Sequence, residues 1–214
     1  MQADCPKQYL QLNGFTILQH TLQRLRDSLP SAQITVAVAT DDPYWDQYTY
    51  PDNVVRVAGG AERCHSVHNA LIALQNQADD EDWVIVHDAA RPCVRPEDIQ
   101  HLLDRVMTHT VGGLLALPVR DTMKRANAAG EIVTTVSRDN LWHALTPQVF
   151  RYRVLLHALT EALNRTELVT DEAQALEKLG YTPLLVAGQA DNIKITHPDD
   201  LALAERYLQQ QALS

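Results

Sequence analysis

The sequence is poor in cysteine and contains no long apolar run. Its three cysteines, Cys5, Cys64 and Cys93, are odd in number and widely spaced, which argues against a disulfide framework and fits a reducing cytosol. No apolar run approaches the roughly 20 residues needed to span a bilayer. The first residues contain no apolar segment typical of a secretory signal. We therefore expect a cytoplasmic protein with no membrane partner.

Positive charge is also scarce, because 18 lysines and arginines stand against 27 aspartates and glutamates. The formal net charge of −9 argues against a general nucleic-acid surface. The three tryptophans and seven tyrosines form no row with basic residues on which single-stranded bases could stack. Gly-x-Ser-x-Gly and Walker lysine motifs are missing too. No nucleic-acid partner is expected, and an anionic ligand would have to be met by lysines and arginines placed locally.

The residues that are present predict a single α/β domain over residues 1–214. The length, with 45% hydrophobic and 21% charged residues, is enough for one sizeable core. Short apolar runs alternate with amphipathic segments, which is typical of a three-layer α/β/α sandwich with a mostly parallel sheet. Strands are expected at 34–39, 54–57, 83–86, 113–119, 184–187 and 193–195. Helices are expected at 16–29, 62–77, 96–109, 151–164, 171–179 and 196–210.

The segment at about 120–140 departs from this alternation. Two short strand-like runs flank a turn at 127–130, which predicts a β-hairpin with exposed faces. Such a hairpin buries little against its own domain. We therefore expect a protruding arm that covers a second subunit of a homodimer. Residues 141–148 are expected only to lead into the following helix.

Asp88 and Arg91 follow the apolar run Trp83–Val86 almost directly. In an open α/β sheet, ligands bind at the carboxyl ends of the strands. Asp88 offers hard oxygen ligands suited to Mg²⁺, and Arg91 offers a guanidinium fork suited to phosphate. A structural role explains these residues equally well: Asp88 could simply pair with Arg91 or cap the turn that follows the strand.

A glycine pair marks a second candidate. Gly59 and Gly60, with Arg63 and Ser66 just after them, lie at a predicted strand-to-helix turn. Backbone N–H groups at such a turn could meet a base or a phosphate. A tight turn explains the pair as well.

Two lysines and two histidines are weaker candidates. Lys194 stands in an apolar stretch, so its ammonium must reach an anion or turn to solvent. Lys7, alone, is more typical of a solvated loop lysine. His65 and His68 lie three residues apart on a predicted helix, but without a third ligand nearby in the sequence a metal site there is not predicted.

Taken together, the motifs resemble those of a known family. In order, the chain contains Cys5-Pro-Lys-Gln-Tyr9, Gly59-Gly-Ala-Glu-Arg63 with Ser66, Val86-His-Asp-Ala-Ala-Arg-Pro92, Pro118-Val-Arg-Asp-Thr-Met-Lys124, Arg138 with Leu141-Trp-His-Ala-Leu-Thr-Pro-Gln148, Thr170-Asp-Glu-Ala173 and Asp191-Asn-Ile-Lys-Ile-Thr196. This series spans essentially the whole chain and resembles the 2-C-methyl-D-erythritol 4-phosphate cytidylyltransferase family. The resemblance implies a Rossmann-like nucleotidyltransferase that moves CMP from CTP to methylerythritol phosphate, releases pyrophosphate and uses Mg²⁺.

The resemblance also implies roles for individual residues. The residues that stabilise the charged phosphorus centre would be the catalytic Lys7 and Lys194. The nucleotide would be held by Gly59, Gly60, Arg63, Ser66, Asp88 and Ala89. The acceptor would be bound by Asp88, Arg91, Thr122, Arg138, Thr146 and Thr170. Asp88 would also hold the metal, and Arg138 would be presented to the other subunit's site.

Two other functions stay open beside this one. The acceptor could be a different polyol phosphate, such as ribitol phosphate, which acceptor competition would reveal. The chain could also be a non-catalytic nucleotide or sugar-phosphate binding protein, which CTP binding without pyrophosphate release would support.

The start of the sequence departs from the family pattern. Family members begin with a strand and an Ala-Ala-Gly-x-Gly-x-Arg-Met loop that wraps the triphosphate, and Met1 falls at that motif's methionine. We therefore expect this 214-residue chain to lack the strand and the loop and to have little activity. Equal turnover by this chain and by a version extended upstream would contradict that expectation.

Overall fold

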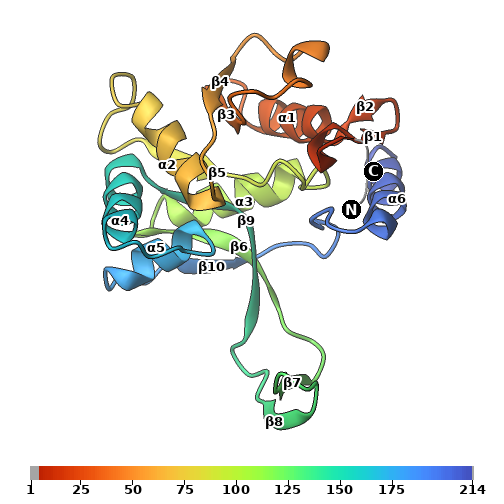
Figure 1. Ribbon diagram of the computed structural model, residues 1–214, viewed down its shortest axis with the longest axis vertical. Coiled ribbons are helices and arrows are strands. Elements are labelled where there is room, and N and C mark those ends of the chain that lie inside the picture. The colour runs from red at the N-terminus through yellow and green to blue at the C-terminus, as the bar shows by residue number, and fades with distance from the viewer. Residues whose placement is uncertain (1–4, 214) are drawn as a thin grey trace.

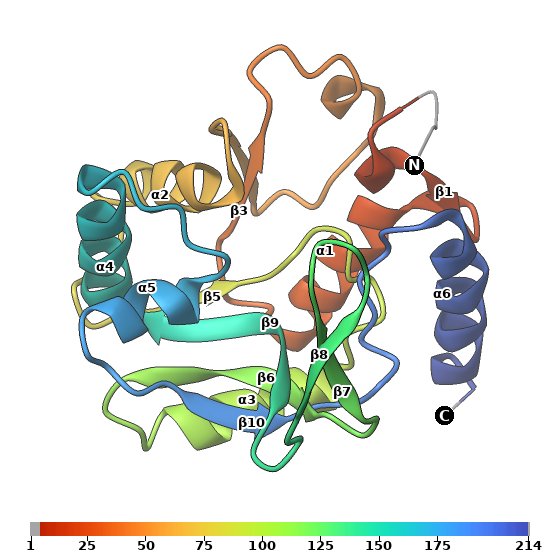
Figure 2. The same cartoon turned by 60° about the horizontal axis from the view of Figure 1, so that its bottom comes forward.

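The structure, a computed structural model, describes residues 5–213 (Figures 1 and 2). Its helices are α1 Ile17–Ser28, α2 Arg63–Ala73, α3 Pro96–Val106, α4 Tyr152–Asn164, α5 Glu172–Lys178 and α6 Pro198–Gln211, with the single 3₁₀ turns η1 Lys7–Tyr9 and η2 Trp45–Gln47. Its strands are β1 Gln11–Leu12, β2 Phe15–Thr16, β3 Ile34–Val38, β4 Val54–Ala58, β5 Trp83–Val86, β6 Gly112–Pro118, β7 Met123–Ala126, β8 Ile132–Val136, β9 Trp142–Arg151 and β10 Leu184–Ala187.

The central sheet has four strands in the order β10-β6-β9-β5. Strands β10 and β6 are parallel, and β9 is antiparallel to both β6 and β5. Strands β10, β6 and β5 therefore run in one direction, and β9 is reversed between two of them. Helices α4 and α5 cover one face of this sheet and α3 covers the other (Figure 2), which confirms the predicted three-layer sandwich.

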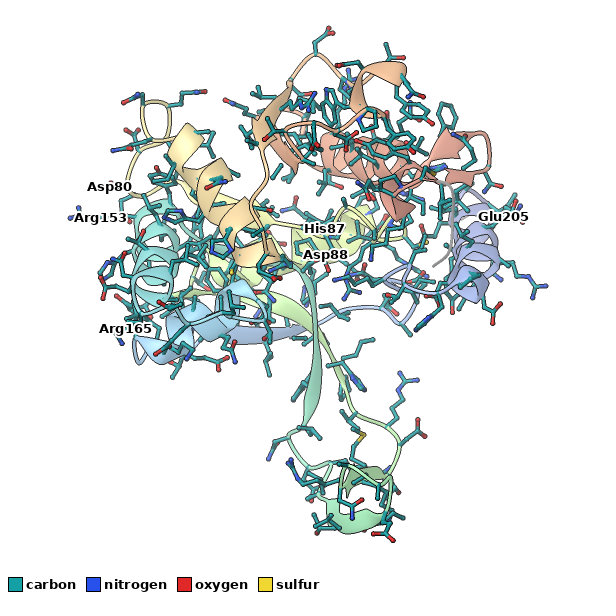
Figure 3. The ribbon with its side chains drawn as sticks, in the orientation of Figure 1. Asp80, His87, Asp88, Arg153, Arg165 and Glu205 are labelled. Carbon is teal, nitrogen blue, oxygen red and sulfur yellow. The ribbon has the colours of Figure 1, made fainter. Side chains whose placement is uncertain are left out.

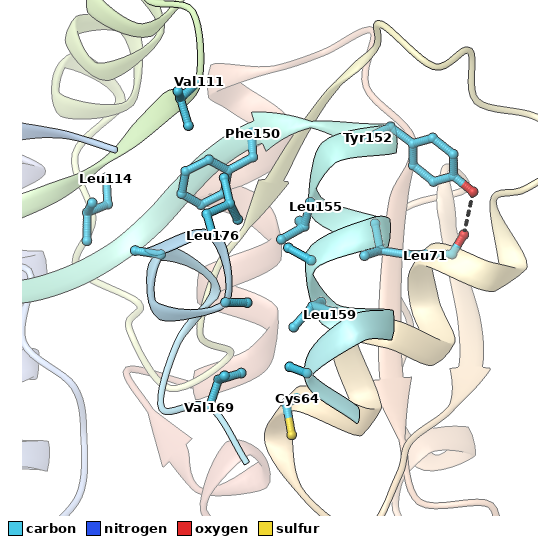
Figure 4. Close-up of a cluster of buried hydrophobic side chains, with 14 residues drawn as sticks. Cys64, Leu71, Val111, Leu114, Phe150, Tyr152, Leu155, Leu159, Val169 and Leu176 are labelled. Carbon is cyan, nitrogen blue, oxygen red and sulfur yellow. Dashed lines mark hydrogen bonds between the residues drawn. The ribbon is translucent and has the colours of Figure 1, made fainter. Parts of the chain in front are cut away.

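Strand β6 is buried on both faces, as its apolar run predicts, and the second half of β9 is buried beside it. Leu114 and Phe150 point into a cluster shared with α2, α4 and α5 (Figure 4). Their chain neighbours Leu115 and Val149 point into the opposite cluster, which α3 completes. In the first cluster the Tyr152 hydroxyl donates a 3.0 Å hydrogen bond to the carbonyl oxygen of Leu71, so α4 is tied to α2 (Figure 4).

The sequence signals for helix starts are realised in the structure. At α1 the Thr16 hydroxyl accepts a hydrogen bond from the Gln19 N–H, and the Gln19 side chain accepts one from the Thr16 N–H. This reciprocal pair satisfies two N–H groups that the helix itself cannot. At α3 Pro96 occupies the first turn, followed by the carboxylates of Glu97 and Asp98. Both helices begin within one residue of the predicted position.

Strand β9 was not predicted, because Pro147 and polar neighbours hid it. Proline cannot donate to a sheet ladder and normally argues against a central strand. Here the β6–β9 register shifts between the pairs Leu114–Gln148 and Ala116–Ala144. Pro147 lies within this irregularity, where its missing N–H group does not interrupt the regular hydrogen bonds between β6 and β9.

The predicted strand at 193–195 is wrong. This segment has no regular strand structure. The Ile195 N–H donates to the carbonyl oxygen of Ala90 at 2.9 Å, and the Ile193 N–H turns back to Asp191. Ile195 is nevertheless fully buried. The apolar composition of residues 193–195 therefore reflects burial against the loop that follows β5. It does not reflect pairing with a neighbouring strand.

An apolar cavity of about 380 Å³ lies beside the central sheet. Strands β3 and β4 form a separate parallel pair. The cavity lies between β3 and β5 and is lined by side chains such as Leu22, Val36, Leu71 and Ile85. One end of it reaches Asp88 and the polar groups described below.

The predicted hairpin is present as strands β7 and β8. It projects from the body on two long connections (Figure 1). Its tip exposes Ile132 and Val133, at 66% and 63% of their surface. Within residues 5–213, none of the helices has both the length and the apolar character that a bilayer crossing demands.

Candidate active site

Three cationic side chains converge on the carboxylate of Asp88, two residues beyond the end of β5. Arg63, the first residue of α2, donates from Nε to Oδ1 at 3.1 Å. Arg91 donates from Nε to Oδ2 at 3.3 Å, and Lys194 Nζ lies 3.0 Å from the same oxygen. Figure 3 places Asp88 in the middle of the body, near the point from which the arm extends. Residues from distant parts of the sequence thus meet at one strand end.

These cations decide the charge state of Asp88. Burial alone would raise the pKa of the Asp88 carboxyl, but Arg63, followed by Lys194 and Arg91, holds this pKa well below its usual range. Lys7 belongs to the same electrostatic group, because burial and then the charge of Lys194 lower the pKa of Lys7. In a chain of net charge −9, this local concentration of cations forms a site suited to a polyanion.

A second layer of hydrogen bonds holds Asp88 from behind. The Asp88 N–H donates to Thr146 Oγ1 at 3.0 Å, and the Thr146 hydroxyl lies 3.0 Å from Nδ1 of His87. His87 Nε2 lies 3.1 Å from the carbonyl oxygen of Arg91. The carbonyl can only accept, so we assign the proton to Nε2, and Nδ1 then accepts from Thr146. Thr146, predicted to bind the acceptor, is itself buried at 4% exposure and supports Asp88.

The buried ring of His87 makes stability depend on pH. Burial lowers the pKa of His87 to about 4, whereas an unfolded histidine titrates near 6.5. Between these values the unfolded chain binds the additional proton, so the free energy of unfolding should fall as the pH drops from about 6.5 to about 4. Urea unfolding at pH 7.5 and 5 measures this fall.

Glutamine at position 87 can still donate to the Arg91 carbonyl but does not titrate. His87→Gln should therefore flatten the pH dependence. His101→Gln, at an exposed position on α3, is the control and should leave the slope as it is. An unchanged slope in His87→Gln would contradict the assignment of a neutral, buried ring.

The glycine pair lies at the turn from β4 into α2. The Gly60 N–H donates to Ser66 Oγ at 2.9 Å. A Cβ on Gly60 would fall 2.3 Å from that of His65, so only glycine fits. The tight turn is therefore real, and nucleotide binding by Gly59, Gly60 and Ser66 stays a prediction.

Two residues that shape the site were missed in the sequence. Asn192 accepts a hydrogen bond from Arg91 Nη1 through its carbonyl oxygen at 2.8 Å and donates from its side chain to the Thr146 carbonyl at 2.9 Å. Glu172 accepts hydrogen bonds from both terminal nitrogens of Arg63, at 2.6 and 2.8 Å. A carboxylate at the start of a helix is too common a pattern to have marked Glu172.

Comparison with known proteins identifies the family. The family described as 2-C-methyl-D-erythritol 4-phosphate cytidylyltransferase matches residues 1–210. The chain belongs to this family. A cytidylyltransferase of that name from Vibrio vulnificus (strain YJ016) is 54% identical over 214 residues, which cover 99% of this chain and 90% of the relative. Another from Vibrio atlanticus (strain LGP32) is 55% identical over 212 residues, which cover 98% and 90%.

A solved structure agrees with this assignment. The crystal structure of 2-C-methyl-D-erythritol 4-phosphate cytidylyltransferase from Francisella tularensis superposes with a TM-score of 0.86 at 40% identity, covering 95% of this chain and 94% of that one. The resemblance drawn from the motifs is thereby confirmed, as are the Rossmann-like α/β fold and membership of a nucleotidyltransferase enzyme family.

The remaining predicted site residues of this cytidylyltransferase chain are Ala89, Thr122, Arg138 and Thr170. Thr122 and Arg138 are exposed at the arm, where Arg138 Nη1 donates to the carbonyl oxygen of Arg120. Thr170 is exposed just before α5. Ala89 lies beside Asp88, and its carbonyl oxygen accepts a hydrogen bond from Thr21. Their predicted roles are not tested by this arrangement.

Asp88 is the metal-ligand candidate of the site. Among residues 5–213, histidine, cysteine, aspartate and glutamate side chains form no group of three or more that could hold a metal ion. Magnesium is commonly held by one or two carboxylates together with waters and substrate phosphates. Asp88 therefore fits Mg²⁺ as one ligand, provided that phosphate oxygens supply others.

Proposed function

We propose that this chain transfers CMP from CTP to 2-C-methyl-D-erythritol 4-phosphate, forming 4-diphosphocytidyl-2-C-methyl-D-erythritol and pyrophosphate in non-mevalonate isoprenoid biosynthesis. The observation that carries the proposal is the convergence of Arg63, Arg91 and Lys194 on Asp88. The names of the family and of its relatives, which specify this acceptor and cytidylyl transfer, support it.

The chemistry that we propose needs charge neutralisation more than covalent help. An oxygen of the acceptor phosphate attacks the α-phosphorus of CTP, a new P–O bond forms, and the α–β P–O bond breaks with its electrons leaving on pyrophosphate. Both reactants are anions, so positioned cations lower the barrier. Lys7 and Lys194 would stabilise the reacting centre, and the Arg91 guanidinium would bind the acceptor phosphate. Bound Mg²⁺ would neutralise triphosphate charge, with Asp88 as its protein ligand.

Pyrophosphate release from CTP tests the proposal directly. The chain is incubated with CTP, Mg²⁺ and methylerythritol phosphate, with ribitol phosphate as the competing acceptor, beside a version extended upstream. Release that depends on methylerythritol phosphate supports the proposal. Preference for ribitol phosphate favours the alternative acceptor. CTP binding without release by either version favours a non-catalytic binding protein.

Homodimer formation through the arm is a further part of the proposal. A two-stranded hairpin is marginal by itself, and the arm exposes Ile132 and Val133 at its tip. A second copy would cover these side chains, and Arg138 would then reach the partner subunit's site. We expect the double variant Ile132→Asp, Val133→Asp to sediment as a monomer.

The control for this variant is Met107→Asp. Met107 is 63% exposed but lies at the end of α3, away from the arm, so its replacement should leave the sedimentation coefficient unchanged. A dimer that survives the arm substitutions, at a protein concentration where the parent chain is dimeric, would refute the role of the arm.

A cytoplasmic location completes the proposal. Cys5, Cys64 and Cys93 are free thiols in the structure. Cysteines that stay free are typical of proteins in reducing compartments.

A further inference from the structure

Glu172 is a buried carboxylate with no place in the reaction proposed above. It is the first residue of α5, and its side chain is only 1% exposed. Burial raises the pKa of Glu172, and the Arg63 guanidinium opposes that rise. A buried ion pair is weak evidence for stability, because desolvation of the two charges offsets much of their attraction. The pair therefore calls for another explanation.

Glu172 rests on a rigid support. Gln148 of β9 donates from Nε2 to Asp171 Oδ2 at 3.0 Å and accepts from the Ala173 N–H at 2.9 Å. Asp171 also caps α5 by accepting from the Gln174 N–H. The residues on both sides of Glu172 are thus fixed to the central sheet at the first turn of α5. The Glu172 carboxylate is therefore held in place, and a movement of Arg63 would break their hydrogen bonds.

The contacts of Arg63 divide its guanidinium between two acids. Nη1 and Nη2 both donate to Glu172, so Nε is the nitrogen that meets Asp88 Oδ1. Within residues 5–213, Asp88 Oδ1 accepts this one bond, while Oδ2 accepts from both Arg91 and Lys194. A carboxylate oxygen can accept about two hydrogen bonds or metal contacts. Oδ1 therefore keeps one lone pair available.

We propose that Glu172 is a positioning residue that holds the two terminal nitrogens of Arg63 and thereby keeps Asp88 Oδ1 open to a divalent cation. Without Glu172, the Arg63 fork could turn and form a two-bond pair with Asp88, the geometry that guanidinium and carboxylate favour. Asp88 would then be closed to a metal. The inference rests on the proposed function for its biological meaning, but its test does not depend on turnover.

Binding of Mn²⁺, as a probe for divalent cations, to the chain with a non-hydrolysable CTP analogue provides that test. Glu172→Gln should weaken Mn²⁺ binding at least fivefold, because the glutamine amide cannot accept both terminal N–H groups. The double variant Arg63→Met, Glu172→Gln removes the blocking guanidinium as well, so most of the lost Mn²⁺ affinity should return when the CTP analogue is present at a concentration that saturates this variant. If Glu172 had only a structural role, the double variant would not recover Mn²⁺ affinity.

Glu167→Gln is the matched control. Glu167 pairs with Lys178, the last residue of α5, at 2.5 Å on the surface, so the same substitution removes an ion pair from the same helix. Its Mn²⁺ affinity should equal that of the parent. Circular dichroism melting curves show which variants are folded at the titration temperature.

The outcomes separate this inference from the proposed function. Parent-like Mn²⁺ binding in Glu172→Gln, no recovery in the double variant, or no Mn²⁺ binding by the parent would each overturn the role of Glu172. Weakening with recovery supports it, even where the parent transfers no CMP. Failure of turnover alone counts against the proposed function and leaves the Mn²⁺ result standing.

Discussion

Lys194→Ala is expected to lower the rate of CMP transfer at least tenfold, which corresponds to about 1.4 kcal/mol or more on the barrier. The Lys194 ammonium lies 3.0 Å from Asp88 Oδ2, and its side chain is 40% exposed. It is thus held beside the metal-ligand candidate yet remains accessible to a bound polyanion. Alanine removes the positive charge that would stabilise the phosphorus centre, where charge accumulates during transfer.

The measurement is pyrophosphate release at saturating CTP. The parent and the variants are compared at the same chain length, either all as this chain or all as the version extended upstream. Lys178→Ala is a close control, because that side chain is 38% exposed and also pairs with a carboxylate, but lies at the end of α5. It should retain parental turnover. Lys194→Arg keeps the charge and should retain more activity than alanine. Turnover of Lys194→Ala within twofold of the parent would remove Lys194 from the catalytic group.

Helices and strands of the main domain were predictable from the sequence where the spacing of apolar residues matched only one kind of secondary structure. The run Trp83–Val86 is a strand, and the Thr16 start of α1 appears within one residue of its predicted position. Strand β9 was hidden, because its proline is acceptable only within a register irregularity that involves β6. The apolar stretch 193–195 was mistaken for a strand, because burial beside a loop and burial in a sheet select the same residue types.

The site was predictable in its composition but not in its connections. Asp88, Arg91 and Lys194 were each recognised as candidates, and the structure brings all three together. The position of Thr146 behind Asp88 could not be read from the sequence, since it depends on β9 lying next to β5. The same is true of Glu172, whose partner Arg63 is 109 residues away along the chain. Long-range pairing of this kind leaves no local pattern.

Asp88→Asn is expected to reduce CMP transfer at least a hundredfold, about 2.7 kcal/mol on the barrier. Asparagine keeps the size of the side chain and one oxygen, so the fold around it should persist. It removes the negative charge that holds Arg63, Arg91 and Lys194 in place and that would bind Mg²⁺. Pyrophosphate release and Mn²⁺ affinity should therefore fall together.

The same substitution should lower stability in a pH-dependent way. Asp88 has a folded-state pKa well below its unfolded value near 4, so its contribution to stability is fully present above that unfolded value and is lost as the pH falls toward the folded pKa. At pH 7, Asp88→Asn should cost roughly 3 kcal/mol, because the largely buried Arg91 loses its ionic partner. Below pH 4 the difference from the parent should shrink, since the unfolded parent chain then binds a proton at Asp88 while the folded chain does not.

Urea unfolding of both proteins at pH 7, 5 and 3 measures this convergence. Asp80→Asn is the control, because Asp80 forms an ion pair with Arg153 in which both side chains are more than half exposed (58% and 72%), labelled in Figure 3. Such a surface pair contributes roughly 0–1 kcal/mol, so this variant should track the parent at every pH. A stability difference for Asp88→Asn that stays constant from pH 7 to pH 3 would mean that the three cations do not depress the pKa of Asp88, and the electrostatic basis of the site would then be wrong.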